Sequence, residues 1–118
     1  MKRVFVYGSL LSGEPNHATR ARFVMEARTA PEFELRHLGE FPGLVRGGTQ
    51  AVAGEVYEID AALLAELDAF EEHPTFYLRT TILLAEGGAA DAYLLRAEQV
   101  AGCPQIASGD WRAFRRRL

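Results

Sequence analysis

Two adjacent glutamates, Glu71 and Glu72, follow a set of apolar residues with helical spacing. These apolar residues are Leu63, Leu64, Leu67 and Phe70. A helix that continues past them aims Glu71 along the apolar stripe and turns Glu72 about 100° further round, towards solvent. Apolar surroundings raise the pKa of a carboxylic acid, so that it can exchange a proton near neutral pH. We therefore interpret Glu71 as a candidate general acid/base, unless the helix ends at Phe70 and leaves this carboxylate in solvent.

A second candidate feature is the glycine-bearing stretch YGSLLSGEPNH at residues 7–17. Gly8 and Gly13 have the spacing of the glycines in a phosphate-binding P-loop, but the chain continues with Glu14 and Pro15 instead of Lys and Ser or Thr. A carboxylate in that place repels phosphate. A glycine-bearing loop after a strand still exposes backbone N–H groups that can bind another anion. The stretch therefore predicts an anion site that does not hold a nucleotide.

Other side chains that could do chemistry form weaker patterns. Ser9 lies outside a G-x-S-x-G sequence and has no evident histidine-and-acid partners, so we interpret its hydroxyl as a ligand contact rather than a nucleophile. Tyr77 is expected either to hydrogen-bond a ligand or to close the core. The histidines lack metal-ligand spacing: His17, His37 and His73. With a single cysteine beside them, we predict no metal site and no cofactor.

These side chains need a scaffold, and the sequence predicts more strands than helices. Asp60 is expected to cap a strong helix that Pro74 stops, and Pro15 to begin a helix that runs to about residue 27. A Pro-Gly turn is expected within FPGLV, residues 41–45. The expected strands are residues 2–7, 32–38, 51–60, 76–86 and 91–98. Because several connections between them are short enough for antiparallel pairing, we predict an α+β fold with a curved or barrel-like sheet.

The bulk composition is that of one ordinary globular domain covering residues 1–118, with 48% hydrophobic and 25% charged residues. The net charge of −3 argues against a nucleic-acid binder, and no apolar run is long enough for a membrane span. The lone Cys103 can form no internal disulfide, which favours a cytoplasmic location. The arginine-rich end, residues 111–118, is interpreted as a solvated, partly frayed tail rather than a grip on phosphate or an acidic partner. Nothing in the sequence indicates the oligomeric state.

Several stretches in order resemble the gamma-glutamylcyclotransferase-like superfamily, and most closely its gamma-glutamylamine cyclotransferase branch. They are VFVYGSL, GEPNH, FPGLV, GEVYEID, LDAFEEHPTFYLR and SGDW. The resemblance covers nearly the whole chain. It implies a small mixed β-barrel with flanking helices and a cavity at the barrel mouth. It also implies cleavage of a small-molecule γ-glutamyl amide into 5-oxoproline and a free amine, by attack of the substrate's own α-amine.

Position by position, the resemblance implies that Tyr7, Gly8, Ser9 and Leu10 hold the glutamyl group. It implies that Glu71 is the general acid/base. Some relatives with the same overall pattern lack this glutamate, whereas this chain retains it. The alternative is a catalytically silent module that binds a small carboxylate in the same cavity. An interaction protein that uses the arginine tail is disfavoured by the acidic net charge.

Overall fold

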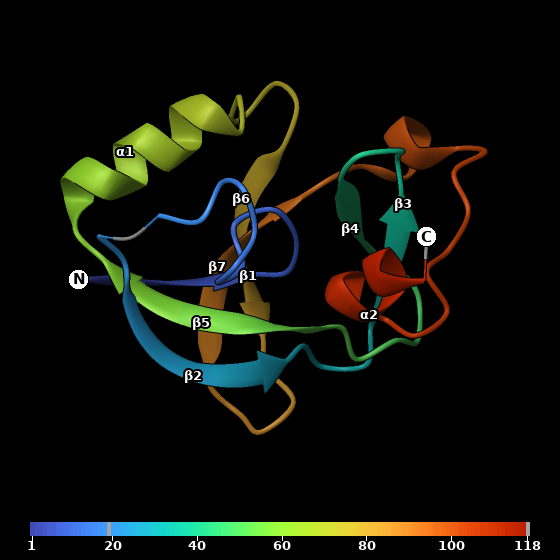
Figure 1. The fold of residues 1–118 in the computed structure, drawn as a ribbon, viewed down its shortest axis with the longest axis horizontal. Helices are drawn as coiled ribbons and strands as arrows, with labels where there is room; N and C mark the ends of the chain where they lie inside the picture. Colours follow the sequence, from blue (N-terminus) through green and yellow to red (C-terminus); the bar gives the residue numbers. More distant parts are fainter. Residues whose placement is uncertain (19, 118) are drawn as a thin grey trace.

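The computed structural model describes residues 1–18 and 20–117, which form one mixed sheet with helices at its ends (Figure 1). The strands are β1 (Lys2–Val6), β2 (Arg22–Arg28), β3 (Phe33–His37), β4 (Pro42–Arg46), β5 (Ala53–Ile59), β6 (Leu78–Leu83) and β7 (Ala89–Leu94). The helices are α1 (Ala61–Phe70), the short 3-10 helix η1 (Ala97–Val100) and α2 (Trp111–Arg116). The sheet runs in the order β2-β5-β1-β7-β4-β3, and β6 pairs with β7 outside this path.

The predicted α+β class is confirmed, but the prediction of a β-barrel is wrong because the sheet does not close. In a barrel every edge strand must find a neighbouring strand. Within the described residues, the outer edge of β3 is instead covered by the segment before α2. The backbone N–H of His37 donates to Pro104 O at 2.9 Å, and the N–H of Ile106 donates to Leu35 O at 2.7 Å. Backbone groups at the outer edge of β3 are therefore hydrogen-bonded without pairing to β2.

Two local predictions are also wrong. Residues 22–28 form β2 rather than the end of a helix that begins at Pro15, because they pair antiparallel with β5 along their length. Such pairing with a distant strand overrides local helix preference. FPGLV is not a turn, since Pro42 opens β4, where proline is tolerated at the first position of a strand. A Cβ on Gly43 would meet Leu95 Cδ1 at 2.4 Å, so this glycine permits close packing.

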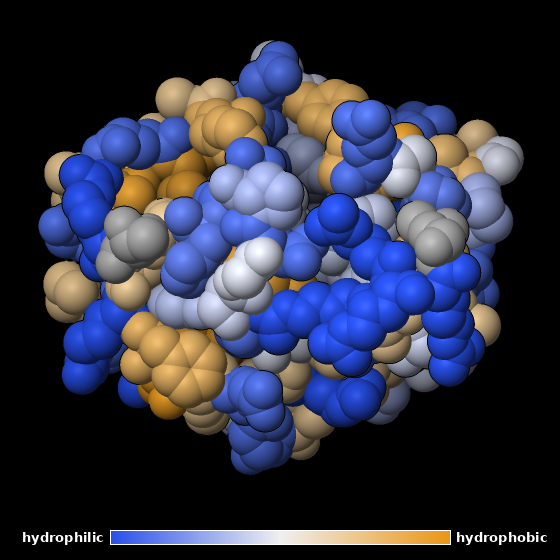
Figure 2. Space-filling model, viewed as in Figure 1, coloured by the Kyte–Doolittle hydropathy of each residue, from blue (hydrophilic) through white to orange (hydrophobic). Residues whose placement is uncertain are grey.

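The helix after Asp60 is confirmed, with the Asp60 side chain accepting a hydrogen bond from the backbone N–H of Leu63 at 2.8 Å. Leu63 and Leu67 are the buried residues of α1. The interpretation of the C-terminal end as a frayed tail is wrong for α2. Trp111 is 2% exposed and stacks on Phe114 with ring centroids 5.8 Å apart, which anchors the helix in the core. Hydrophilic residues gather on the face that carries α2 (Figure 2).

In the part of the chain that the structure describes, none of the helices has the length and apolar character needed to cross a membrane.

Candidate active site

A cavity of about 240 Å³ lies where β1 and β4 diverge along the same edge of β7. Val4 of β1 is in register with Asp91 of β7, whereas Leu44 of β4 is in register with Leu94 further along. Between them the chain leaves β1 at Val6 and enters β4 at Pro42. The residues lining the cavity are Phe5, Val6, Tyr7, Gly8, Ser9, Leu10, Asn16, Phe41, Pro42, Phe70, Glu71, Glu72, Phe76, Tyr77 and Tyr93.

The Tyr7 hydroxyl links β7 and β4 at the place where β1 and β4 diverge. The hydroxyl donates to the backbone carbonyl of Tyr93 at 2.6 Å and accepts from the backbone N–H of Leu44 at 3.2 Å. It thus replaces strand pairing where β1 and β4 part. Burial, the neighbouring Tyr77 and the charge of Glu71 raise the pKa of Tyr7 well above its ordinary value. The phenol is therefore a buried structural link, and its hydroxyl proton is already donated.

The loop after β1 brings the predicted residues Gly8, Ser9 and Leu10 to the cavity wall. A Cβ on Gly8 would lie 2.7 Å from Pro42 Cγ, so only glycine allows this approach. The loop carbonyls are bonded: Gly8 O accepts from Leu11 N and Ser9 O from Asn16 N, both at 3.0 Å. Among residues 1–18 and 20–117, no partner is found for the backbone N–H groups of Gly8, Ser9 and Leu10. These three donors are available to a ligand.

Glu71 lines the same cavity, although α1 ends one residue before it. As the C-cap residue it donates its backbone N–H to Leu67 O at 2.8 Å. The side chain is partly buried, and burial raises the pKa of Glu71 to about 7. Within the described residues, no hydrogen bond or ion pair to its carboxylate is present. Ending the helix at Phe70 therefore does not release the carboxylate into solvent.

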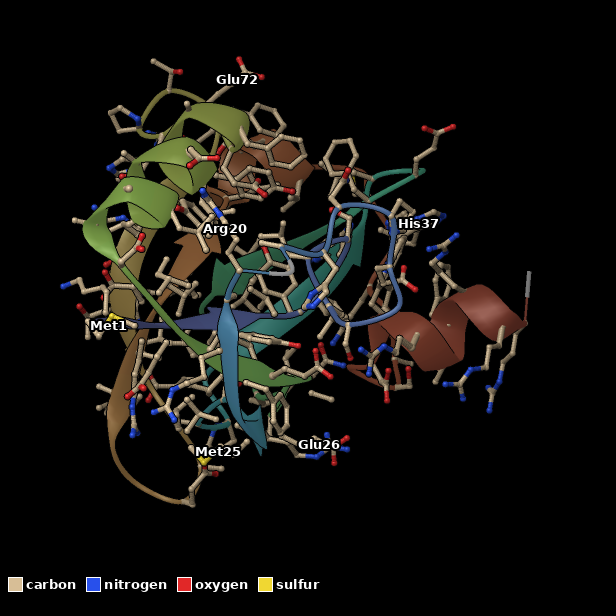
Figure 3. The ribbon with its side chains drawn as sticks, turned by 60° about the vertical axis from the view of Figure 1, so that its left-hand side comes forward. Met1, Arg20, Met25, Glu26, His37 and Glu72 are labelled. Atoms are coloured by element: carbon tan, nitrogen blue, oxygen red, sulfur yellow. The ribbon has the colours of Figure 1, made fainter. Side chains whose placement is uncertain are left out.

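Glu72 differs from its neighbour in both backbone and surroundings. Its φ of 53° lies in the left-handed region, which is uncommon for a residue other than glycine. The side chain is exposed and projects beyond the end of α1, although the residue borders the cavity mouth (Figure 3). The backbone leaves the helical conformation at this residue, and of the two neighbouring glutamates Glu71 is partly buried whereas Glu72 is exposed.

The sequence predicts that Tyr77 either hydrogen-bonds a ligand or closes the core, and its contacts favour the second role. Its hydroxyl is buried and donates to the backbone carbonyl of Pro42 at 2.9 Å. Burial, with a smaller contribution from the charge of Glu71, raises the pKa of Tyr77. Tyr77 thus fixes the start of β4 beside the cavity, and only the lone pairs of its oxygen remain for a ligand.

A hydrogen-bond network that the sequence did not predict holds the end of α1. Asp68 accepts from Arg79 Nε at 2.9 Å and from the Tyr93 hydroxyl at 2.6 Å. Arg79 also contacts Asp91 at 2.6 Å, which joins α1 to β6 and β7. The sequence places Asp68 on the same helical side as Glu72, which suggests a solvated residue. The sequence could have indicated this network, because the opposite charges Asp68 and Arg79 both lie within the stretch LDAFEEHPTFYLR.

A second hydrogen-bond network, which the sequence also did not predict, holds the loop of residues 8–17. Glu55 is 4% exposed and accepts from Ser12 N at 2.8 Å, Ser12 Oγ at 2.7 Å and the Tyr57 hydroxyl at 2.9 Å. Arg112 of α2 lies 3.0 Å from the same carboxylate. Arg115 of α2 pairs with Glu14. The C-terminal helix therefore holds in place the loop that lines the cavity with Gly8, Ser9 and Leu10.

The histidines have structural contacts. His17 Nδ1 lies 3.0 Å from Leu10 O, and His73 Nδ1 accepts from the backbone N–H of Arg79 at 2.9 Å. His37 packs on Phe114 with ring centroids 4.8 Å apart. Across the described ranges, no three histidine, cysteine or acidic side chains are grouped closely enough to hold a metal ion.

Comparison with known proteins places this geometry in a family. The family model described as gamma-glutamyl cyclotransferase, AIG2-like, matches residues 4–113. The Escherichia coli gamma-glutamylcyclotransferase family protein YtfP is 40% identical over 112 residues, covering 92% of this chain and 95% of its own. Gamma-glutamylaminecyclotransferase B of Danio rerio is 42% identical over 95 residues, which cover 71% of this chain and 50% of that protein. The crystal structure of an AIG2-like protein from Mus musculus has a TM-score of 0.79 and 30% identity, covering 89% of this chain and 85% of the mouse chain.

Proposed function

The chain belongs to the gamma-glutamyl cyclotransferase, AIG2-like, family of enzymes, and we propose that it cleaves a γ-glutamylamine-type amide. The products are 5-oxoproline and the free amine, and Glu71 moves the proton. The observation that carries this proposal is one cavity lined by both a carboxyl group with a pKa of about 7 and a loop in which three backbone N–H groups have no partner among the described residues. A proton carrier and an anion site thus face the same space.

The substrate supplies the nucleophile in this reaction. Its α-amine nitrogen attacks the γ-carbonyl carbon, and a five-membered ring closes as the C–N bond forms. Glu71 takes a proton from this nitrogen and then donates it to the amine nitrogen as the amide bond breaks. The enzyme ends in its starting protonation state. An α-amino group has a pKa near ~8, so a carboxyl group with a pKa of about 7 is well matched to it, unlike an ordinary glutamate.

The loop after β1 is suited to the negative charges of the substrate. Neither lysine, arginine nor histidine is found among the cavity-lining residues of the described chain, so positive potential there comes from backbone N–H groups. We assign Gly8, Ser9 and Leu10 to the substrate α-carboxylate or to the oxyanion that forms on the γ-carbonyl oxygen. In other enzymes one such donor contributes about 3–4 kcal/mol to the stability of the transition state. The Ser9 hydroxyl is a further donor.

The test is direct detection of both products. Purified protein is incubated with γ-glutamyl amides of simple primary amines, and 5-oxoproline and free amine are quantified. Equal amounts of the two products are expected, and none from an analogue whose α-amine is acetylated. Saturable binding of the amide without any product would instead establish the silent carboxylate-binding module. The expected compartment for the activity is the cytoplasm, where the single Cys103 stays reduced.

A further inference from the structure

Three phenylalanines surround the mouth of the cavity. Phe41 lies just before β4, Phe70 is the last residue of α1, and Phe76 lies in the segment that leads to β6. Phe41 is 36% exposed and Phe70 is 55% exposed, while Phe76 is half-buried. Figure 2 shows apolar surface beside the end of α1. We call this set the aromatic rim.

The rings of the aromatic rim line the same cavity as the candidate acid/base. Phe41 and Phe76 meet edge to face with centroids 6.2 Å apart, and Phe76 packs edge to face on Tyr77 at 5.1 Å. Phe70 is the chain neighbour of Glu71, and both line the cavity. A ligand group that lies beside Glu71 therefore shares the cavity with these rings.

Core packing accounts for part of the placement of Phe76 but not for that of the exposed Phe41 and Phe70. The buried residues of α1 are Leu63 and Leu67, so Phe70 adds little to the core. Single exposed apolar side chains are common on proteins, but three aromatic rings from separate segments around one cavity mark a ligand surface. The rim thus offers apolar contact area to whatever part of a ligand extends from the cavity.

The charges at the mouth restrict that part of the ligand further. The charged groups that line the cavity in the described chain are the carboxylates of Glu71 and Glu72. A carboxylate on the amine half would be repelled and would lack a cationic partner. Glu72 projects outward into solvent, where a charge attracts a cation only weakly (Figure 3). Apolar contact with the rings therefore selects among leaving amines more strongly than the charge of Glu72 does.

We propose that the aromatic rim binds the amine half of the substrate and selects uncharged apolar amines, with aromatic ones preferred. This inference rests on the proposed function and specifies the class of leaving amine. The edge or face of an aromatic substituent can pack on Phe41, Phe70 and Phe76 while the glutamyl group occupies the cavity below. A methyl substituent is too short to reach all three rings.

The experiment compares five γ-glutamyl amides on the intact protein: those of methylamine, butylamine, benzylamine, 1,4-diaminobutane and glycine. We expect kcat/KM for the benzylamide to exceed that for the methylamide by about tenfold or more, with the butylamide between them. Phe70→Ala should reduce the benzyl-to-methyl ratio at least about fivefold. Phe23→Ala is the matched control, because Phe23 is 50% exposed, packs on Tyr57 and lies on β2 away from the cavity lining. It should leave the ratio unchanged.

Several outcomes would overturn the proposal. One is equal kcat/KM for the benzyl and methyl amides, and another is a ratio that Phe70→Ala does not change. Faster cleavage of the diaminobutane or glycine amide would show that charge, not apolar contact, selects the amine. If none of the amides is cleaved, the proposed function fails instead. The rim is then tested by calorimetry, which measures the affinities of wild type and Phe70→Ala for the benzyl and methyl amides. The benzyl-to-methyl ratio of these affinities should be lower in Phe70→Ala than in wild type.

Discussion

Glu55 and Glu71 both turn a carboxylate away from bulk water, but their surroundings are opposite. Burial alone would raise the pKa of Glu55, but hydrogen bonds from Ser12, Arg112 and Tyr57 lower it below the ordinary value. Glu71 has no such donors among the described residues, and burial raises its pKa to about 7. The less exposed of the two glutamates is thus the one that stays ionised.

The difference shows that hydrogen-bond partners, rather than burial, decide what a shielded carboxylate can do. A carboxylate with four donors is held in its charged form and joins parts of the chain. A carboxylate without donors gives up and takes a proton near neutral pH. In this protein the first arrangement holds the loop of residues 8–17, and the second lines the same cavity as that loop. Glu55 therefore contributes to stability, whereas the proposed chemistry is assigned to Glu71.

The largest effect is expected from Glu71→Gln. The amide keeps the shape of the side chain but cannot carry the proton, so kcat for 5-oxoproline release should fall by at least about 100-fold. Binding of the γ-glutamyl amide, measured by calorimetry, should change little. Activity within a few-fold of wild type would remove Glu71 from the proposed mechanism.

Glu55→Gln should act mainly on stability. It removes the charge that Arg112 and Ser12 hold, so the free energy of unfolding in urea should fall by about 1–3 kcal/mol at pH 7. Because the native pKa of Glu55 is lowered, this contribution is present above the ordinary pKa and is lost as the pH falls through the native value. Glu58→Gln is the matched control on β5, since Glu58 pairs with Arg22 and Arg3 at the surface. Equal effects of the two variants would contradict the network.

Glu71 should have the opposite effect on the pH dependence of stability. Its native pKa of about 7 lies above the ordinary 4.5, so between these values the folded state binds more protons than the unfolded state. Wild-type stability therefore loses a contribution as the pH rises through this window. Glu71→Gln should be of similar stability at pH 4 and more stable than wild type by about 1–3 kcal/mol at pH 8. A difference that is constant with pH would show that Glu71 titrates normally.

The smallest effect is expected from Glu72→Gln. Its carboxylate is exposed and projects into solvent at the edge of the cavity, so it should neither move the proton nor bind the glutamyl group. A surface change of this kind is worth about 0.5 kcal/mol or less, or roughly twofold in kcat/KM for the methylamide. A loss of activity as large as that of Glu71→Gln would mean that the two carboxylates act together.

Local features of the fold were predictable, and those that depend on distant partners were not. Spacing and the cap at Asp60 were sufficient for α1, and the resemblance pointed to Glu71 even though the helix ends before it. Strand β2 was mistaken for a helix because its identity depends on pairing with β5. The hydrogen bonds that Glu55 accepts from Ser12 and Arg112 join residues 43 and 57 positions apart, and no local pattern indicates them. The aromatic rim is assembled in the same way from three separate segments.

The most direct test of the contrast between the two glutamates is a titration of their side-chain carboxyl carbons by NMR. The protein is labelled with carbon-13 at glutamate, and Glu71→Gln and Glu55→Gln assign the two signals. We expect Glu71 to titrate at about pH 7 and Glu55 to titrate below its ordinary value of 4.5. A Glu71 signal that titrates near 4.5 would contradict the claim that this carboxylate is the proton carrier.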